Sequence, residues 1–240
     1  MVNATEWINQ NYPVNGTCQR VEDKENYGKT RSQITELDVS NQNLEGIFNI
    51  DGFRLKKLNC SFNKLNNYLI DFTHIEEIDF SHNQLMLSFG ISLRWTPRFQ
   101  KVNLSHNSIA SFINREVPGL THLDVSNNLL TNLDVWGTRD LVELNCSGNP
   151  FLTNFSFSSL SNLKSFDCLG VKFTKSDNIV SPTSTALATA TVYTDNPALF
   201  SNTIGLGIYS GISTLGWLAL AFVFFYKRFW WKAFIPTPGS

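Results

Sequence analysis

The chain has 240 residues, a formal net charge of −1 at pH 7 and a hydrophobic fraction of 42%. This length allows one domain of good size with an appendage, and the apolar fraction is sufficient for a sizeable core. The near-zero net charge gives no broad attraction to nucleic acid, which argues against a nucleic-acid-binding protein. Charged residues are sparse at 16%, and none occurs between Asp195 and Lys227.

Residues 1–33 are expected to form an N-terminal cap made of a short helix and a loop. The segment from Ala4 to Tyr12 predicts a helix that lays Trp7 and Ile8 over the first unit of the next domain. Pro13 ends this helix, because the residue before a proline disfavours the helical conformation. The start of the chain has neither a basic stretch nor an apolar run of signal-peptide length. Either the protein has no secretory signal or this chain lacks its true start.

Residues 34–174 repeat the template L-x-x-L-x-L-x-x-N-x-L about seven times, with unit starts 20 to 24 residues apart. The residues at positions one, four, six, nine and eleven are Ile34, Leu37, Val39, Gln42 and Leu44; Leu55, Leu58, Cys60, Asn63 and Leu65; Ile75, Ile78, Phe80, Asn83 and Leu85; Phe99, Val102, Leu104, Asn107 and Ile109; Leu120, Leu123, Val125, Asn128 and Leu130; Leu141, Leu144, Cys146, Asn149 and Phe151; Leu163, Phe166, Cys168, Val171 and Phe173. The alternating apolar positions have the period of two of a β-strand. One unit cannot bury this face alone, so the units are expected to stack.

This pattern resembles leucine-rich repeat domains. The segments EWINQNYP and ITELDVSNQNLEG also resemble small fungal leucine-rich repeat proteins, whose strands read LDCSNN or LNCSGN. The resemblance implies an α/β-type solenoid with parallel strands on the concave face and loops or 3-10 turns on the convex face, since units this short leave little room for a full helix. The asparagine at position nine is expected to bond backbone groups at the bend after each strand. The resemblance implies a fold and not an activity.

Six sequons for N-glycosylation occur, and three of them follow from the repeat itself. Position five alternates between aspartate and asparagine, and position seven is serine in the first six units. A sequon therefore arises automatically at Asn59, Asn103 and Asn145, where a glycan would lie in the middle of the inner sheet face. The candidate glycosylation sites that remain are Asn3, Asn15 and Asn154.

The cysteines favour a reducing compartment. Cys60, Cys146 and Cys168 fall at position six, where a thiol behaves as a small apolar side chain. Cys146 and Cys168 are expected on adjacent strands, so a disulfide between them is the alternative to the free thiols that we favour. Cys18 has no obvious partner, and the paired cysteines that usually staple the ends of repeat ectodomains are missing.

Position three carries charges that alternate in sign over the first four units, from Glu36 and Lys57 to Glu77 and Lys101. Neighbouring strands therefore neutralise each other, which argues against RNA or another polyanion as a ligand. The surface is either a solvated ladder or a protein-binding face, and seven strands about 4.8 Å apart span roughly 29 Å, wide enough for a standard interface. The candidate partner-binding residues are Lys56, Lys57, Phe62, Glu76, Glu77, His82, Lys101, His106 and His122.

No catalytic motif is found: the phosphate-binding loop, the nucleophile elbow and the zinc-protease motif are all absent from the sequence. We therefore predict neither an enzyme nor a cofactor. His82 and His106 both precede the asparagine of position nine on neighbouring strands. Two ligands on an exposed face are too few for a dedicated metal site, so no metal is predicted.

Residues 175–203 are rich in Ser, Thr and Ala and are expected to form an extended stalk. Residues 204–226 have no charge and would span roughly 34 Å as a helix, enough to cross a bilayer. The tail at 227–240 is basic and aromatic. The residues assigned to the membrane and its boundary are Ile204, Gly207, Gly211, Trp217, Phe222, Phe224, Phe225, Tyr226, Lys227, Arg228, Trp230 and Trp231. Gly207 and Gly211 form a G-x-x-x-G motif that permits weak self-association.

The predicted function is that of a single-span membrane protein that binds a protein partner without catalysis. The cations after the span favour a cytosolic tail and an extracellular repeat domain, which would be a receptor-like or adhesive ectodomain on a glycosylated stalk, acting with a co-receptor. The missing signal and the unstapled cysteines favour instead a tail-anchored protein with its repeats in the cytosol. We favour the tail-anchored arrangement, and the extracellular one stays open.

Overall fold

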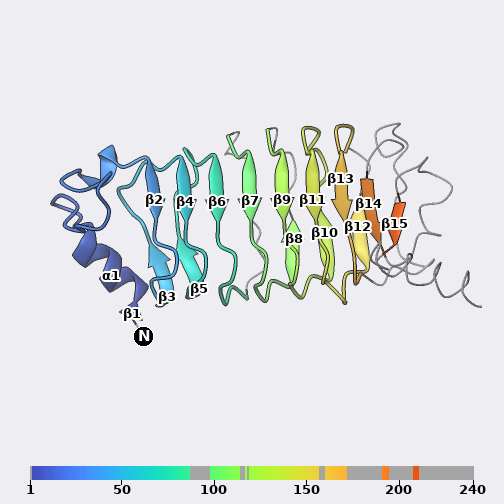
Figure 1. The fold of residues 1–240 in the computed structure, drawn as a ribbon, viewed down its shortest axis with the longest axis horizontal. Coiled ribbons are helices and arrows are strands. Elements are labelled where there is room, and N and C mark those ends of the chain that lie inside the picture. Colours follow the sequence, from blue (N-terminus) through green and yellow to red (C-terminus); the bar gives the residue numbers. More distant parts are fainter. Residues whose placement is uncertain are drawn as a thin grey trace, which may run out of the picture.

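The computed structural model describes residues 2–86, 98–113, 117, 119–156 and 160–171, together with the strands at 191–194 and 208–210. These residues form a β-solenoid of parallel strands, which confirms the stacked-repeat fold predicted from the sequence. Figure 1 shows one row of strands standing side by side, with a helix at the N-terminal end.

The row is a single long sheet in which neighbouring strands are parallel and in register. Seven of its strands cover positions three to five of the seven units: β2 (Glu36–Asp38), β4 (Lys57–Asn59), β6 (Glu77–Asp79), β7 (Lys101–Asn103), β9 (His122–Asp124), β11 (Glu143–Asn145) and β13 (Ser165–Asp167). Two further strands, β14 (Thr191–Thr194) and β15 (Ile208–Ser210), continue the sheet.

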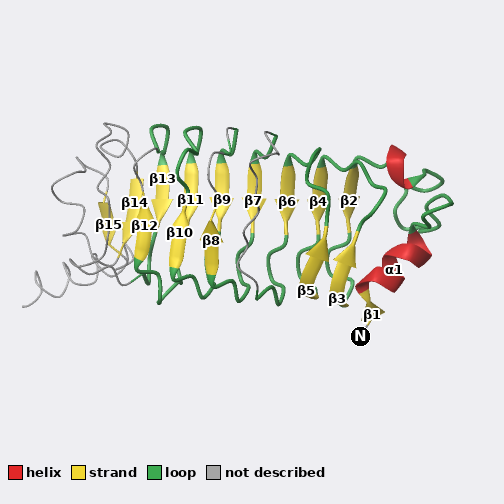
Figure 2. Cartoon of the chain, turned by 180° about the vertical axis from the view of Figure 1, so that it is seen from behind, coloured by secondary structure: helices red, strands yellow, loops and turns green. Residues whose placement is uncertain are grey.

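The side opposite the long sheet corrects the expectation of loops or 3-10 turns. In the described residues it carries two small parallel sheets, seen from behind in Figure 2. Their strands are β1 (Val2–Asn3), β3 (Leu44–Asn49) and β5 (Lys64–Leu69), and β8 (Ser111–Ile113), β10 (Asn132–Asp134) and β12 (Asn154–Ser156). A strand forms here because single apolar side chains such as Phe112, Leu133 and Phe155 point inward and are fully buried.

The N-terminal cap contains the helix α1 (Ala4–Asn11), which packs against β3. The Oδ1 of Asn3 accepts a hydrogen bond from the Glu6 backbone amide at 3.0 Å and begins the helix. A 3-10 helix, η1 (Arg31–Gln33), follows later in the cap. Its Arg31 is only 5% exposed, and its guanidinium donates to the carbonyls of Tyr12 and Asp51, each at 2.7 Å, and to Asn9 Oδ1 at 2.6 Å. These bonds hold the helix, the loop and the first unit together.

The core follows the repeat template with one exception. Leu58, Ile78 and Leu104 at the inward positions are at most 3% exposed. In unit six, however, Phe151 at position eleven is exposed and Leu152 is buried in its place. The Leu152 amide bonds the Asn149 carbonyl at 3.2 Å, so a turn through Pro150 shifts the inward position by one residue.

Buried asparagines at position nine join each unit to the one before it. Asn63 Oδ1 accepts from the Leu44 backbone amide at 3.0 Å, and its Nδ2 donates to the carbonyls of Val39 at 2.9 Å and Cys60 at 3.0 Å. The same bonding recurs at Asn83, Asn107, Asn128 and Asn149. Each amide therefore closes its own bend, as expected, and also fixes the neighbouring unit.

The expected membrane segment is mostly outside the described residues, together with the tail and most of the stalk. All residues assigned to the membrane and its boundary lie there. Three residues of the segment, Ile208–Ser210, are described, and they form the strand β15 and not part of a helix. In the part of the chain that the structure describes, no helix combines the length and the apolar character needed to cross a bilayer.

Candidate functional site

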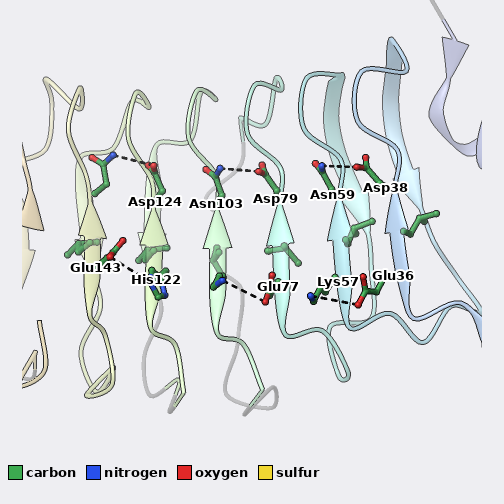
Figure 3. A pocket seen from close by; sticks show the side chains of 18 of the residues that line it. Glu36, Asp38, Lys57, Asn59, Glu77, Asp79, Asn103, His122, Asp124 and Glu143 are labelled. Carbon is green, nitrogen blue, oxygen red and sulfur yellow. Dashed lines mark hydrogen bonds and ion pairs between the residues drawn. The ribbon is translucent and has the colours of Figure 1, made fainter. Parts of the chain in front are cut away.

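The long sheet exposes positions three and five of each unit, because position four between them points into the core. We call this surface the polar face. A hollow of about 730 Å³ runs along it, from the cap loop to β13. Figure 3 shows its two rows of side chains, with Glu36 and Lys57 in one and Asp38 and Asn59 in the other. The hollow is a feature of the polar face that a ligand could occupy.

Position three carries ion pairs between neighbouring strands. Lys57 Nζ lies 3.7 Å from Glu36 Oε1, and Lys101 Nζ lies 3.9 Å from Glu77 Oε1. His122 Nε2 lies 3.8 Å from Glu143 Oε1, and this pair is ionic only when the imidazole is protonated. These side chains are exposed, so each pair contributes less than about 1 kcal/mol to stability. The row is therefore adaptable and not part of what holds the fold together.

Position five carries hydrogen bonds between an aspartate and the asparagine of the next unit. The Nδ2 atoms of Asn59, Asn103 and Asn145 donate to Oδ2 of Asp38, Asp79 and Asp124 at 3.2, 3.1 and 3.2 Å. Each Oδ1 in the row accepts from the backbone amide two residues later, as Asp79 does from Ser81 at 2.8 Å. The amides of all three repeat-derived sequons are thus engaged within the polar face.

Both rows pair the same strands: β2 with β4, β6 with β7, and β9 with β11. At position three, lysine and glutamate have opposite charges in the first two pairs, but at position five the asparagine is neutral and leaves the aspartate charged. As a result, nine carboxylates and only two lysines line the hollow. The polar face is strongly acidic, although the chain as a whole is nearly neutral.

The cap loop forms one end of the hollow. Asn26 Nδ2 donates to the Glu36 carbonyl at 2.9 Å and to Asp23 Oδ2 at 3.0 Å, and Tyr12 Oη donates to the same Asp23 oxygen at 2.6 Å. Burial, and then the bond to Asp23, raise the pKa of Tyr12 above its usual range, so its hydroxyl stays a donor. The loop is therefore fixed to β2, and its Asp23 and Glu25 supply two of the nine carboxylates of the hollow.

The nine candidate partner-binding residues belong to three separate rows. Lys57, Glu77, Lys101 and His122 are at position three and line the hollow. Lys56 and Glu76 are at position two, before the strands begin, and Glu76 borders a second hollow of about 750 Å³ with Arg98, Asp140 and Lys164. Phe62, His82 and His106 are at position eight, beyond the other end of the strands. The structure thus brings together only part of the predicted set.

The residues at position eight form a stacked ladder of rings. The ring centroids of Phe62 and His82 are 4.1 Å apart with planes at 12°, and those of His82 and His106 are 4.1 Å apart at 11°. Asn127 Nδ2 lies 3.3 Å from His106 Nε2 and continues the row. Burial, and then the charge of a protonated His106, lower the pKa of His82, while Asp79 acts in the opposite direction. We call Phe62, His82 and His106 the ring ladder.

The sequence analysis missed the aspartates Asp38, Asp79, Asp124 and Asp167, which line the hollow. It treated position three as self-neutralising and used the alternation at position five only to explain the sequons. The signal that identifies these aspartates is the period of two itself, since positions three and five of one strand must share a face. Their charges therefore add to those of the glutamates.

The described residues contain no group of three or more His, Cys, Asp or Glu side chains arranged to hold a metal.

The four cysteines are buried free thiols: Cys18, Cys60, Cys146 and Cys168. Burial raises the pKa of Cys60 and Cys146 and makes these thiols poor nucleophiles. Of the candidate glycosylation sites, Asn15 lies in an exposed turn, Asn3 caps α1, and Asn154 is exposed on β12.

No protein-family model matches the chain, and no curated protein matches it. Among solved structures, the chain is similar to the functional domain of InlJ from Listeria monocytogenes, which is described as including a cysteine ladder. The sequence identity is 18%, the TM-score is 0.45, and the match covers 85% of this chain and 60% of that chain. The similarity therefore spans less than two thirds of the InlJ chain, and no residue role is transferred from it.

Proposed function

We propose that this chain is a non-catalytic leucine-rich repeat protein that binds an extended, basic segment of a partner protein on the polar face. The observation that carries this proposal is the hollow along seven strands, which nine carboxylates and two lysines line. A basic segment complements this charge, whereas an acidic one is repelled. The exposed, weakly paired side chains at position three leave the strand surface accessible.

The aspartates at position five also match the spacing of an extended chain. Asp38, Asp79, Asp124 and Asp167 occur on every second strand of the sheet. Two strand steps of about 4.8 Å place them about 9.6 Å apart, and one turn of a polyproline II helix, which is three residues long, advances about 9.3 Å. A segment that crosses the strands in this extended conformation, with a lysine or arginine at every third residue, has all its cations on one face and presents one to each aspartate.

The experiment that tests this proposal measures the binding of a labelled peptide to the full chain. The peptide (KAA)4 carries a lysine at every third residue, and (KA)4A4 has the same composition with a shorter spacing. We expect (KAA)4 to bind several-fold more tightly than (KA)4A4, to lose affinity as salt is added, and the acidic peptide (EAA)4 not to bind. No binding of (KAA)4 at low salt overturns the proposal.

Matched variants localise the binding. Asp79→Asn with Asp124→Asn removes two charges from the polar face, and asparagine already occupies this position on the neighbouring strands. Since each exposed ion pair contributes up to about 1 kcal/mol, we expect an affinity loss of about 10-fold. Asp134→Asn is the control, because its Oδ1 accepts from the Trp136 amide at 3.0 Å in the same kind of turn but on β10, in the other sheet. An equal loss of peptide affinity in Asp134→Asn would mean that the peptide does not bind on the polar face.

We also propose that the apolar segment 204–226 holds the solenoid at a membrane, with the repeats in the cytosol. The support is the sequence alone, which has no charge from Asn196 to Tyr226. Alkaline carbonate extraction is expected to leave the full chain in the membrane pellet, and its release contradicts the anchor. Protease treatment of intact membranes is then expected to digest the repeats.

The second arrangement, an extracellular ectodomain that acts with a co-receptor, is favoured by the cations Lys227, Arg228 and Lys232 after the apolar segment. Protection of the repeats from protease, together with a mobility shift on endoglycosidase treatment, supports this second arrangement. Loss of such a shift in Asn15→Gln assigns the glycan to the exposed turn of the cap.

A further inference from the structure

Position eight has the same unusual backbone conformation in every unit, but three consecutive units fill it with rings. The backbone φ is +56° at Phe62 and +55° at His82 and His106. The other four units have Asn41, Asn127, Gly148 and Gly170 there, with φ between +52° and +75°. Glycine, asparagine and histidine adopt this left-handed region more readily than phenylalanine does. The local backbone therefore does not account for Phe62 in this row.

Stacking between neighbouring rings instead explains why rings occupy this position. His82 is covered on one side by Phe62 and on the other by His106, with centroids 4.1 Å away in both directions. Phe62 is nevertheless 53% exposed, so the ring ladder is a surface feature and not part of the core. A stack of this kind is most stable when the imidazoles are neutral, because two imidazolium rings at this distance repel each other.

Three groups face His82. His106 stacks on one side of its ring, Phe62, which carries no charge, stacks on the other, and Asp79 lies at the end of β6. His106 contacts His82 and the neutral amide of Asn127. Asp79 is one of the aspartates of the hollow, so a proton on His82 acts directly on a carboxylate of the polar face.

His122 adds a third histidine to the same surface. Its Nε2 lies 3.8 Å from Glu143 Oε1, its Nδ1 lies 2.8 Å from Thr121 Oγ1, and Lys101 is its register partner on β7. The chain has 4 histidines in all, and His82, His106 and His122 are three of them. Histidine is the side chain that ordinarily changes charge between pH 5 and 8.

We propose that the ring ladder makes the polar face sensitive to protons, so that a basic segment bound at neutral pH is released in mild acid. This inference rests on the proposed function. At neutral pH the rings stack and add no charge to the face. In acid, His82 and His106 gain positive charges beside Asp79, which oppose the cations of the ligand and separate the rings. His122 contributes in the same direction by neutralising Glu143.

The test compares the affinity of the full chain for (KAA)4 at pH 7.5 and pH 5.5, at constant ionic strength. The variant is His82→Asn with His106→Asn, because Asn41 and Asn127 show that asparagine is accommodated at this position. At about 3-fold per added charge, we expect the wild type to lose about 10-fold or more and the variant about 3-fold. Adding His122→Gln to the variant is expected to remove most of the remaining loss.

The outcomes separate this inference from the proposed function. Equal losses in the wild type and in the double variant overturn the ring ladder as the sensor, while binding at pH 7.5 still supports the proposed function. No binding at either pH overturns both. An NMR titration without peptide gives an independent check, in which the His82 ring signal is expected to titrate at lower pH in the wild type than in His106→Asn, because a charged His106 opposes protonation of His82. An unchanged His82 titration in His106→Asn contradicts the coupled ladder.

Discussion

Asparagine recurs in two rows of this solenoid, and the two rows behave differently. At position nine the asparagines are at most 9% exposed, and each bonds main-chain groups of two units. At position five they are half-buried and bond an aspartate side chain and a serine. The comparison teaches that burial decides the role of an amide here: the inner row holds the coils together, and the outer row shapes a charged surface.

The largest expected effect breaks the inner row. Asn107→Ala removes the bonds to the carbonyls of Phe80 at 2.9 Å and Leu104 at 3.0 Å and to the Leu85 amide at 3.0 Å. Because these groups become buried and unsatisfied, we expect a loss of about 2–4 kcal/mol in the free energy of unfolding, measured by urea denaturation. Asn103→Ala in the same unit is expected to lose about 1 kcal/mol. Equal losses of stability in Asn107→Ala and Asn103→Ala would contradict the different roles of the two rows.

A smaller loss of stability is expected from a substitution at position eight, which lies between positions five and nine in each unit. The φ of Gly148 is +65°, and a Cβ there would lie 2.5 Å from Asn127 Oδ1. We expect Gly148→Ala to reduce stability by about 2 kcal/mol, from backbone strain and from the clash. Gly46→Ala is the matched variant, since its φ is +84° and nothing lies within 4 Å of the added Cβ. It should lose about 1 kcal/mol, and a larger loss at Gly46 than at Gly148 contradicts the role of the contact.

The charged side chains at position three should tolerate neutralisation. Glu77 and Lys101 are 3.9 Å apart at the surface, so their coupling is expected to be below about 0.5 kcal/mol in a double-mutant cycle with Glu77→Gln and Lys101→Met. A coupling above about 1.5 kcal/mol would mean that position three is structural and not adaptable. Thermal unfolding of the four proteins at low salt provides the measurement.

The smallest expected effect is on the pH dependence of stability. The pKa of His82 is lower in the folded protein than its usual value of about 6.5 in an unfolded chain. The unfolded state therefore binds more protons in mild acid, and the contribution of His82 is complete above pH 6.5 and is lost as the pH falls through the folded pKa. Between pH 7.5 and 5.5, the wild type should lose more stability than His82→Asn. A larger loss in the variant gives the wrong sign and contradicts the shift.

Most of the fold could be predicted because it depends on the alternation of apolar residues. Leu58 and Leu104 are buried where the period of two places them, and their strands lie in one sheet. The exchange of Phe151 for Leu152 could not be predicted in this way, since it depends on how the chain turns through Pro150. The strands of the opposite side were missed because one inward residue per strand, such as Leu133, is too weak a pattern to separate a strand from a loop.

The candidate site was predicted only in part, for two different physical reasons. The charges of the polar face were all visible in the sequence, but their sum depends on recognising that Glu77 and Asp79 share one surface. The ring ladder is different, because the sequence places His82 and His106 on neighbouring strands without fixing the directions of their side chains. Those directions follow from the positive φ at position eight, which the presence of a histidine alone does not predict.

Because neighbouring strands are paired two by two, repeat units can be added or removed without loss of these contacts only in pairs. Every pair, such as β6 with β7, carries one ion pair and one aspartate bonded to one asparagine. Deleting a coil with asparagine at position five, such as that of β7, would bring two aspartates against each other and leave a glutamate without its lysine. Deleting a coil with aspartate there, such as that of β6, would bring two asparagines together and leave a lysine without its glutamate. Deleting a pair would keep both kinds of contact, so the smallest exchangeable module is a double coil, and the polar face should lengthen in increments of about 9.6 Å.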